Sequence, residues 1–245
     1  MRLAIFSAFP HEIRPLVRNL NAARISTSLP FTVFLAPHVS GEVVVVQSGM
    51  GTRNAEASLD HVIKEHNPTM ILSLGFGGAL YDNAAIGELI WASRVLLMNN
   101  GVRDTMDLPD SDHLFGRLSQ TLALREGTII TLEQWMKKPE IKRALSEPLP
   151  FPVCDMETFP LAKATIARGL PFVAIRSITD RSHEEIPPAL LNVSDESGNY
   201  RPSRALKVLL GNPSLIPLAV TLGKNSAIAS RNLWRAVKAL IEVRQ

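Results

Sequence analysis

The chain has 245 residues, of which 46% are hydrophobic and 20% charged, and its formal net charge is +3. These values exclude an intrinsically disordered chain, and the length suits a single α/β domain with a sizeable core. One cysteine excludes an intrachain disulfide framework, and the lack of a signal-peptide pattern and of an apolar run of about 18 residues predicts a soluble cytoplasmic protein.

Apolar clusters and turn residues alternate along the first part of the chain. Short apolar runs that end at turn residues indicate strands, and apolar positions at helical spacing indicate helices. The expected strands are residues 2–8, 42–47, 70–74 and 87–97, and the expected helices are 12–20 and 54–66. Strand, helix and strand in this order indicate a βαβ unit with parallel strands. We therefore expect one α/β domain, 1–245, in which helices flank a mixed, mostly parallel twisted sheet.

The next part of the chain contains a polar segment and then two more strands. Residues 98–125 are polar and loop-like, and their carboxylates and histidine are Asp104, Asp107, Asp110, Asp112 and His113. Their spacing matches no calcium loop, and solvated loop carboxylates are far commoner than metal ligands, so we expect no metal site. Further strands are expected at 127–132 and 171–178.

Small residues follow three of the expected strands, at 48–51, 75–78 and 177–180. Glycines let a ligand approach the backbone, and free amides at a helix N-terminus favour a polar group, so together these turns predict a ligand cradle. The alternative is that each glycine only makes a turn. Neither glycine cluster fits a dinucleotide fingerprint or a P-loop, which argues against NAD and nucleoside triphosphates and predicts no cofactor.

Two carboxylates lie at opposite ends of a predicted helix–strand unit. Glu157 stands where a helix begins, and Asp180 stands where the following buried strand ends. Because ligands of α/β sheets bind at the carboxyl ends of strands, we expect both carboxylates at one small-molecule site. The alternatives are an N-cap role for Asp180 and, for residues 155–157, acidic residues that complement a helix dipole.

Five motifs in order resemble those of the nucleoside phosphorylase and nucleosidase superfamily, and within it the 5′-methylthioadenosine/S-adenosylhomocysteine nucleosidase-like branch. The motifs are SAFPHEI at 7–13, SGMG at 48–51, LGFGG at 74–78, DME at 155–157 and SITD at 177–180. The resemblance implies a purine nucleosidase or nucleoside phosphorylase that works as a homodimer or higher homo-oligomer, without a metal or an organic cofactor.

The resemblance also implies the catalytic residues. Asp180 would be the general acid that protonates the leaving purine, and burial at a strand end would keep its proton near neutral pH. Glu12 would be the base that activates water, since a carboxylate beside a phosphate dianion is repulsive. Hydrolysis is therefore favoured over phosphorolysis. Against hydrolysis stand Arg14 and Arg53, because either can bind phosphate, although solvated helix faces are the commoner place for such arginines. The separate alternative for Glu12 is an exposed first-turn glutamate.

A second group of residues is expected to bind substrate. Glu157 would hold the ribose hydroxyls, Met156 would pack beneath the sugar, and Trp135 falls where the family places an aromatic ring against the base. The remaining expected substrate-binding residues are Ser48, Gly49, Gly75 and Met136. An ordinary core or interface tryptophan is the alternative for Trp135. Three departures from the family pattern put the exact nucleoside in doubt: Asp155 replaces glutamate, Thr179 replaces serine, and Pro160 interrupts the helix after the DME motif.

The segment 182–245 is read as a divergent, basic and apolar C-terminal extension. From Tyr200 onward eight basic residues face the single acid Glu242, a net charge of +7, so the rest of the chain sums to −4. The tail resembles that of the hopanoid-associated branch, which implies removal of adenine from an adenosylated triterpenoid. A basic amphipathic tail also predicts peripheral membrane contact. The alternative is that its apolar residues cover the core or a dimer interface.

Two other functional classes stay open beside the enzyme. One is a non-catalytic nucleoside- or lipid-binding protein that keeps the fold without turnover. The other is nucleic-acid binding by the basic tail, which its proline- and leucine-rich interior and the lack of a recognised motif disfavour.

Overall fold

A computed structural model describes residues 2–25, 31–38, 41–49, 52–99, 101–145, 147–187 and 202–244. The strands are β1 (Arg2–Ser7), β2 (Ala23–Ile25), β3 (Thr32–His38), β4 (Gly41–Gln47), β5 (Met70–Ala79), β6 (Leu89–Met98), β7 (Val102–Asp107), β8 (Leu124–Leu132), β9 (Val153–Asp155) and β10 (Phe172–Asp180). The helices are α1 (Pro10–Asn19), α2 (Thr52–His66), α3 (Leu114–Leu118), α4 (Lys138–Ala144), α5 (Thr158–Ile166), α7 (Pro202–Gly211) and α8 (Ile216–Val243), with short 3-10 turns η1 (Ser111–His113) and η2 (Pro213–Leu215). The predicted strands and helices are thereby confirmed, with shifted ends.

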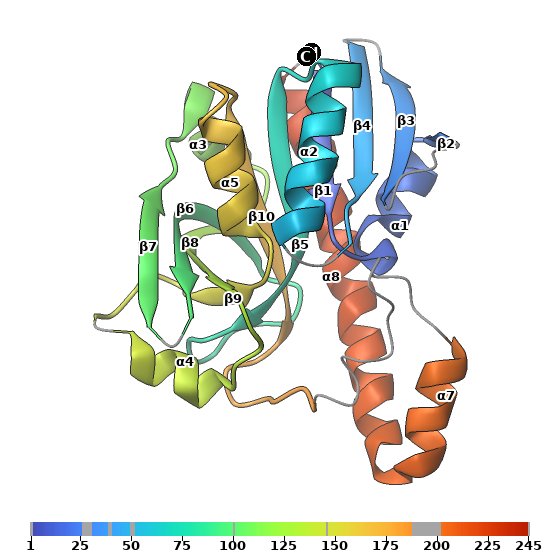
Figure 1. Ribbon diagram of the computed structural model, residues 1–245, viewed down its shortest axis with the longest axis vertical. Helices are drawn as coiled ribbons and strands as arrows, with labels where there is room; N and C mark the ends of the chain where they lie inside the picture. Colours follow the sequence, from blue (N-terminus) through green and yellow to red (C-terminus); the bar gives the residue numbers. More distant parts are fainter. Residues whose placement is uncertain are drawn as a thin grey trace.

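The described strands form one mixed sheet, shown in Figure 1. Its path is β10-β6-β8-β9-β5-β1-β4-β3-β2, and β10 also pairs with β5, so that β5, β9, β8, β6 and β10 close into a ring. Strand β1 lies between β4 and β5 and is parallel to both, which confirms the predicted βαβ unit. Strand β10 runs parallel to β5. The carboxyl ends of β1, β4, β5 and β10 therefore meet at one edge.

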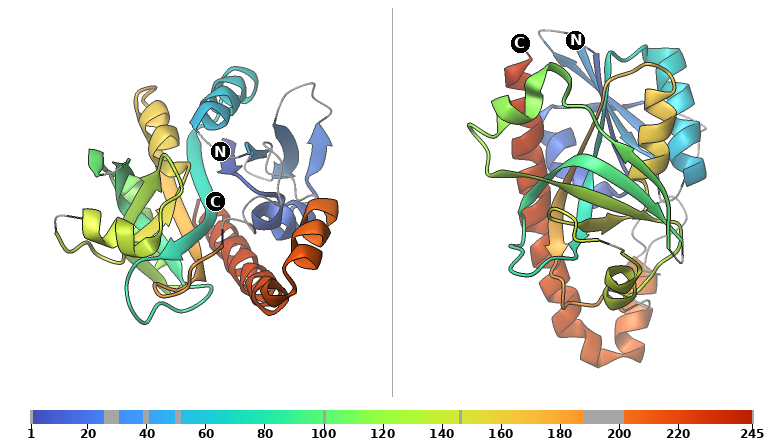
Figure 2. Two further views of the ribbon diagram at one scale, coloured as in Figure 1. Left: turned by 60° about the horizontal axis from the view of Figure 1, so that its bottom comes forward. Right: turned by 90° about the vertical axis from the view of Figure 1, so that its left-hand side faces the viewer.

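Helices cover both faces of the sheet, as the end-on view of Figure 2 shows. Alternate residues of β1 explain this arrangement: Leu3 and Ile5 pack with α1 and the C-terminal half of α8, whereas Ala4 and Phe6 pack on the side of α2 and α5. All four side chains are buried. A strand that is buried on both faces reads as a continuous apolar run, which is why the sequence predicted these central strands well.

Two expectations from the sequence were wrong. The segment 98–125 is not a loop throughout, because it contains β7 and α3; β7 is an exposed edge strand paired with β6, so its polar side chains hide the strand pattern. Pro160 does not interrupt α5 either. It is the third residue of that helix, where the backbone N–H has no intrahelical partner, so proline costs no hydrogen bond.

The C-terminal helices divide into a buried part and a protruding part. The end of α8 packs against α1 and β10, and Asn225 Nδ2 donates to the Thr179 carbonyl at 2.9 Å. The start of α8, η2 and α7 extend past the body of the molecule, at the end where the central strands finish (Figures 1 and 2). We call residues 203–224 the hairpin.

Candidate active site

Two cavities lie beside each other where the central strands end. The first is lined by Glu12, Ser48, Gly75, Glu157 and Arg176 among others. The lining of the second includes Trp135, Met136, Lys138, Met156 and Asp180. The cavities adjoin, because Met156 of one and Glu157 of the other are consecutive. Eight of the nine predicted site residues thus line this pair of cavities.

The ninth residue, Gly49, lines neither cavity. It continues the turn after β4 with a positive φ of 76°, a conformation that favours glycine. Its carbonyl accepts a hydrogen bond from Ser48 Oγ at 3.0 Å. The structure therefore places Ser48 at the site and gives Gly49 the role of a turn residue; Met50 and Gly51 of the same motif lie outside the described residues.

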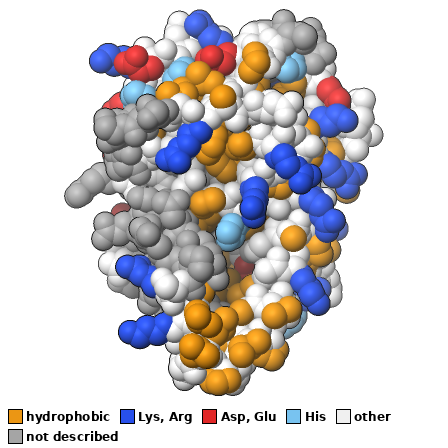
Figure 3. All heavy atoms as spheres, turned by 90° about the vertical axis from the view of Figure 1, so that its right-hand side faces the viewer, with side chains coloured by type: hydrophobic (Ala, Val, Ile, Leu, Met, Phe, Trp, Pro, Cys, Tyr) orange, Lys and Arg blue, Asp and Glu red, His pale blue; other side chains and the backbone are white. Residues whose placement is uncertain are grey.

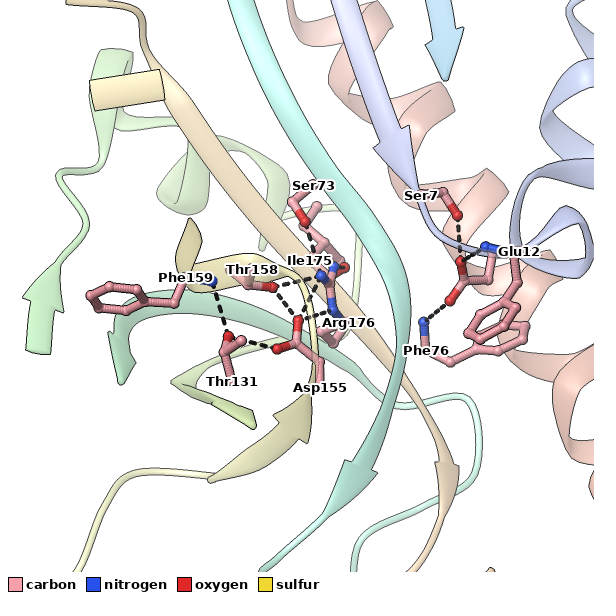
Figure 4. A network of polar contacts seen from close by, with 11 residues as sticks. Ser7, Glu12, Ser73, Phe76, Thr131, Asp155, Thr158, Phe159, Ile175 and Arg176 are labelled. Carbon is pink, nitrogen blue, oxygen red and sulfur yellow. Dashed lines mark hydrogen bonds and ion pairs between the residues drawn. The ribbon is translucent and has the colours of Figure 1, made fainter. Parts of the chain in front are cut away.

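Glu12 is held in the first cavity by three donors. Its Oε2 accepts from Ser7 Oγ at 2.5 Å and from the Phe9 amide at 2.8 Å, and its Oε1 accepts from the Phe76 amide at 2.7 Å (Figure 4). Phe9 caps α1 in an extended conformation, and a glutamate three residues later can reach back to the cap amide. The side chain is only 4% exposed, so the alternative of an exposed first-turn glutamate is wrong.

The environment of Glu12 suits a base. Burial raises the pKa of Glu12 above its ordinary value, and the hydrogen bonds from Ser7, Phe76 and Phe9 oppose that shift without cancelling it. A carboxylate with a raised pKa is a stronger proton acceptor once it is ionised. Gly75 makes room for this arrangement: a Cβ at that position would lie 2.9 Å from Glu12 Oε1.

A buried ion pair fixes the turn that carries Glu157. Arg176 Nε donates to Asp155 Oδ2 at 2.9 Å, and Arg176 Nη2 lies 2.7 Å from the same oxygen. Thr131 Oγ1 donates to Asp155 Oδ1 at 2.7 Å, and Thr158 Oγ1 also donates to Asp155 (Figure 4). Asp155 is therefore not a solvated acid of the first helical turn. Although it replaces the glutamate of the family pattern, both of its carboxylate oxygens accept hydrogen bonds.

Arg176 was missed by the sequence reasoning, although a signal existed. It is the one charged residue inside the apolar run of β10, and an arginine there must find a partner once it is buried. Besides Asp155 it donates to the Ile175 carbonyl at 3.0 Å and to Ser73 Oγ at 2.9 Å. Arg176 is the only cation among the described residues that line the first cavity, and Asp155 neutralises it.

From the sequence, two other arginines, Arg14 and Arg53, are candidate phosphate ligands. Arg14 is exposed on α1 and lines a separate surface cavity with Pro10 and His11. The side chain of Arg53 lies outside the described part of the structure. Arg14 therefore brings no cation to Glu12.

Asp180 lies in the second cavity beside a lysine that the sequence did not predict. Lys138 Nζ is 2.5 Å from Asp180 Oδ2, and Thr179 Oγ1 donates to Asp180 Oδ1 at 2.7 Å. Asp180 and Lys138 are 4% and 7% exposed. From the sequence, burial alone is expected to keep Asp180 protonated. The structure instead places the Lys138 ammonium beside it. Residues 181–187 are not helical, so the N-cap alternative for Asp180 is wrong.

Lys138 reaches the cavity because it opens helix α4. The sequence around it is rich in lysine and reads as a solvated helix start, which is why composition gave no signal. Its ammonium also donates to the Asp180 carbonyl at 3.3 Å and to the Arg181 carbonyl. A Cβ at Gly78 would lie 2.9 Å from Asp180 Oδ2 and 3.3 Å from Lys138 Cε, so that glycine admits both groups.

The rest of the second cavity is mainly apolar. Trp135 is 39% exposed at its rim, so it is not a core tryptophan, and Met136 and Met156 add flexible apolar surface. Burial, followed by the nearby Asp180 charge, raises the pKa of the Cys154 thiol to about 12. Cys154 is therefore no thiolate nucleophile at neutral pH. A ligand with an apolar ring and polar atoms at one edge would fit this cavity, whose lining is mainly apolar and includes Asp180 and Lys138.

Comparison with known proteins shows the family of the chain. The family model of the phosphorylase superfamily matches residues 2–199. The 5′-methylthioadenosine/S-adenosylhomocysteine nucleosidase of Shewanella halifaxensis (strain HAW-EB4) is 25% identical over 206 residues, which cover 76% of this chain and 89% of that protein. The protein of the same description from Shewanella baltica (strain OS195) is 25% identical over 239 residues, or 90% of this chain and 100% of its own.

Solved structures show the same fold. The S-adenosylhomocysteine nucleosidase of Streptococcus pyogenes, in complex with 5-methylthiotubericidin, superposes with a TM-score of 0.72 at 18% identity, covering 100% of this chain and 98% of the other. The futalosine hydrolase of Helicobacter pylori strain 26695 gives a TM-score of 0.71 at 15% identity, with 99% and 97% covered. These likenesses confirm the predicted α/β architecture.

Proposed function

The chain belongs to the phosphorylase superfamily, and from this premise we propose that it is an enzyme that hydrolyses the N-glycosidic bond of a purine nucleoside. One observation carries the proposal: two buried carboxylates, Glu12 and Asp180, face adjoining cavities that share the 155–157 turn. The first cavity contains a buried carboxylate that can act as a base. The second is mainly apolar and places Asp180 beside Lys138.

The chemistry follows from this division. As the base departs, the ribosyl group becomes an oxocarbenium ion, and Glu12 orients a water molecule and accepts its proton. Glu157, at the turn fixed by the Asp155–Arg176 pair, holds the sugar hydroxyls. The leaving purine nitrogen takes its proton from the site where Lys138 Nζ lies 2.5 Å from Asp180 Oδ2.

Hydrolysis fits the first cavity better than phosphorolysis. A phosphate dianion needs cations that are free to pair with it, and the cation that the described lining provides, Arg176, is already neutralised by Asp155. Glu12 would in addition repel a phosphate. The many hydrolytic relatives support the same reading.

The finer parts of the proposal concern substrate and assembly. We propose an adenine-type nucleoside whose 5′ position is modified or linked to a lipid, because the chain's tail resembles that of the hopanoid-associated branch and the hairpin is apolar. We also propose that the protein acts in the cytoplasm as a homodimer or larger homo-oligomer, as the family resemblance implies. The rival function is a nucleoside- or lipid-binding protein without turnover, for which the apolar second cavity would suffice.

A substrate panel tests the proposal. Adenosine, 5′-methylthioadenosine, inosine and a lipid-linked adenosine are each incubated with the protein, with and without phosphate, and the free purine is measured. We expect release of adenine from at least one adenosine derivative in phosphate-free buffer. Release only with phosphate would favour phosphorolysis, and tight binding without release from any substrate would favour the binding protein.

A further inference from the structure

The hairpin presents apolar side chains to solvent in a regular pattern. Leu206 and Leu210 are 58% and 71% exposed on α7, and Ile216 and Val220 are 46% and 51% exposed on the first turns of α8. Residues four apart lie on the same face of a helix, so each helix carries one outward apolar pair. Figure 3 shows hydrophobic side chains gathered at the lower end of the molecule, where the hairpin lies.

The charged residues in the sequence of the hairpin itself have a single sign. No aspartate or glutamate occurs from residue 202 to residue 241, whereas that stretch contains six lysines and arginines. Lys207 on α7 and Lys224 on α8 are both exposed. Exposed leucines beside the exposed lysines Lys207 and Lys224 match the chemistry of an anionic lipid surface, where apolar side chains enter the interface and cations meet the headgroups.

The hairpin also lies at the same end of the molecule as the candidate active site. It extends past the body at the end of the molecule where β1, β4, β5 and β10 finish, which is the end that carries both cavities (Figure 1). Its base is anchored to the site, because Asn225 of α8 bonds the carbonyl of Thr179, the residue before Asp180. A membrane surface bound by the hairpin would therefore lie at the end of the molecule that carries the candidate active site.

From this pattern we infer that the hairpin is a docking element for an anionic membrane surface. The apolar pairs enter the lipid interface and the lysines bind the headgroups, while the α/β body stays in water. Within the described residues no single helix is long and apolar enough to span a bilayer; α7 and α8 pass that test only as a pair, which is bent by 112°. Docking on the surface therefore fits the geometry. The inference does not depend on the proposed reaction.

Vesicle binding by the full chain tests the inference. The protein is mixed with vesicles of phosphatidylcholine, with or without phosphatidylglycerol, and the bound fraction is measured by co-sedimentation. We expect binding to the anionic vesicles, weakening as salt rises because salt screens the charges over about 10 Å at 0.1 M. The double variant Leu206→Asn, Leu210→Asn should lower the apparent affinity at least about tenfold, since one apolar pair is lost.

Two matched variants separate the contributions. Lys207→Gln with Lys224→Gln should weaken binding to anionic vesicles and remove the preference for phosphatidylglycerol. Val102→Asn replaces an exposed apolar residue on β7, away from the hairpin, and should bind like the parent. Melting temperatures close to that of the parent show that each variant is folded.

Four results would overturn the inference. The first is a parent protein that does not bind vesicles, and the second is a leucine variant that binds as the parent does. The third is a leucine variant that converts an oligomer to monomers in the absence of vesicles while vesicle binding is nil, which would make this face a contact between copies. The fourth is bound protein that resists both high salt and alkaline carbonate, which would point to insertion of the bent pair instead of surface docking.

Discussion

Glu12 and Asp180 are each 4% exposed, yet the structure gives them opposite surroundings. Glu12 is bonded by neutral donors, a hydroxyl and two amides, and burial raises its pKa. Asp180 has an ammonium at 2.5 Å and a hydroxyl at 2.7 Å. Equal burial therefore does not give two carboxyl groups equal chemistry; the nearest partner decides whether a site accepts or supplies a proton.

Under the proposed function, the two cavities have different tasks. We expect the Glu12 cavity to bind water and sugar, and the Asp180 cavity to bind the leaving base. Each of the following substitutions changes one side of this comparison and leaves the other intact. Glu56→Gln, at an exposed position on α2, is the control for the carboxylate variants.

The largest loss is expected from Asp180→Asn. Without the carboxylate the leaving base has no proton relay, and kcat/KM should fall about 10³- to 10⁴-fold, at the upper end for general acid catalysis. The measurement is the initial rate of purine release. Because Lys138 would keep a buried, unpaired charge, the double variant Asp180→Asn, Lys138→Met is measured as well. Parental rates in both variants would refute the acid role of this cavity.

A somewhat smaller loss is expected from Glu12→Gln, about 10²- to 10³-fold in kcat, since bound water keeps some reactivity without its base. The base must be ionised, so parental activity rises with pH through the pKa of Glu12, which lies above that of an ordinary glutamate. The pH profile of kcat/KM should therefore have an acid limb above about pH 4.3, the pKa of a free glutamate side chain. The variant should lose this limb. An unchanged acid limb would show that another group titrates.

The next substitution changes Lys138, the cation that forms an ion pair with Asp180; Glu12 has no such partner among the described residues. Lys138→Met should lower kcat about 10- to 100-fold, because Asp180 loses the ammonium that lies against its Oδ2 and the leaving base loses a nearby positive charge. Lys138→Arg should restore part of the rate, since it keeps the charge at nearly the same place. The informative measurement is the separation of kcat from KM: kcat should fall in the methionine variant while KM stays near the parental value. A parental kcat with a changed KM or melting temperature would reduce Lys138 to a structural residue.

The smallest effect is expected from Gly75→Ala. The added methyl group would lie 2.9 Å from Glu12 Oε1, so the carboxylate must shift by a few tenths of an ångström. We expect kcat to fall roughly tenfold or less while KM changes little, because misplacement of a catalytic group lowers the rate. Gly116→Ala, where a Cβ meets nothing within 4 Å, is the control. Equal rates in both variants would mean that the position of Glu12 is not critical.

Much of the fold was predictable from the sequence, for an identifiable reason. The central strands are buried on both faces and leave unbroken apolar runs, and the helices that cover them leave apolar residues at helical spacing. Strand β7 escaped prediction because it lies at an exposed edge. The 28 residues of α8 were noticed as apolar and basic, but whether they packed or protruded depended on tertiary contacts.

The site was predictable in its carboxylates and unpredictable in their partners. Glu12, Glu157 and Asp180 could be named because ordered motifs mark the ends of strands. The approach of Lys138 to Asp180 spans 42 residues of sequence and requires α4 to fold over the end of β10. No local pattern encodes such a contact. Arg176 had a local signal in its apolar strand, but its partner Asp155 did not.

The central claim is that water, activated at Glu12, attacks the nucleoside. Its most direct test is product analysis with an adenine nucleoside in the presence of saturating phosphate. For each purine released, the account predicts one free reducing sugar, and no sugar 1-phosphate, at a rate that phosphate does not increase. A sugar 1-phosphate formed in step with the purine would contradict it.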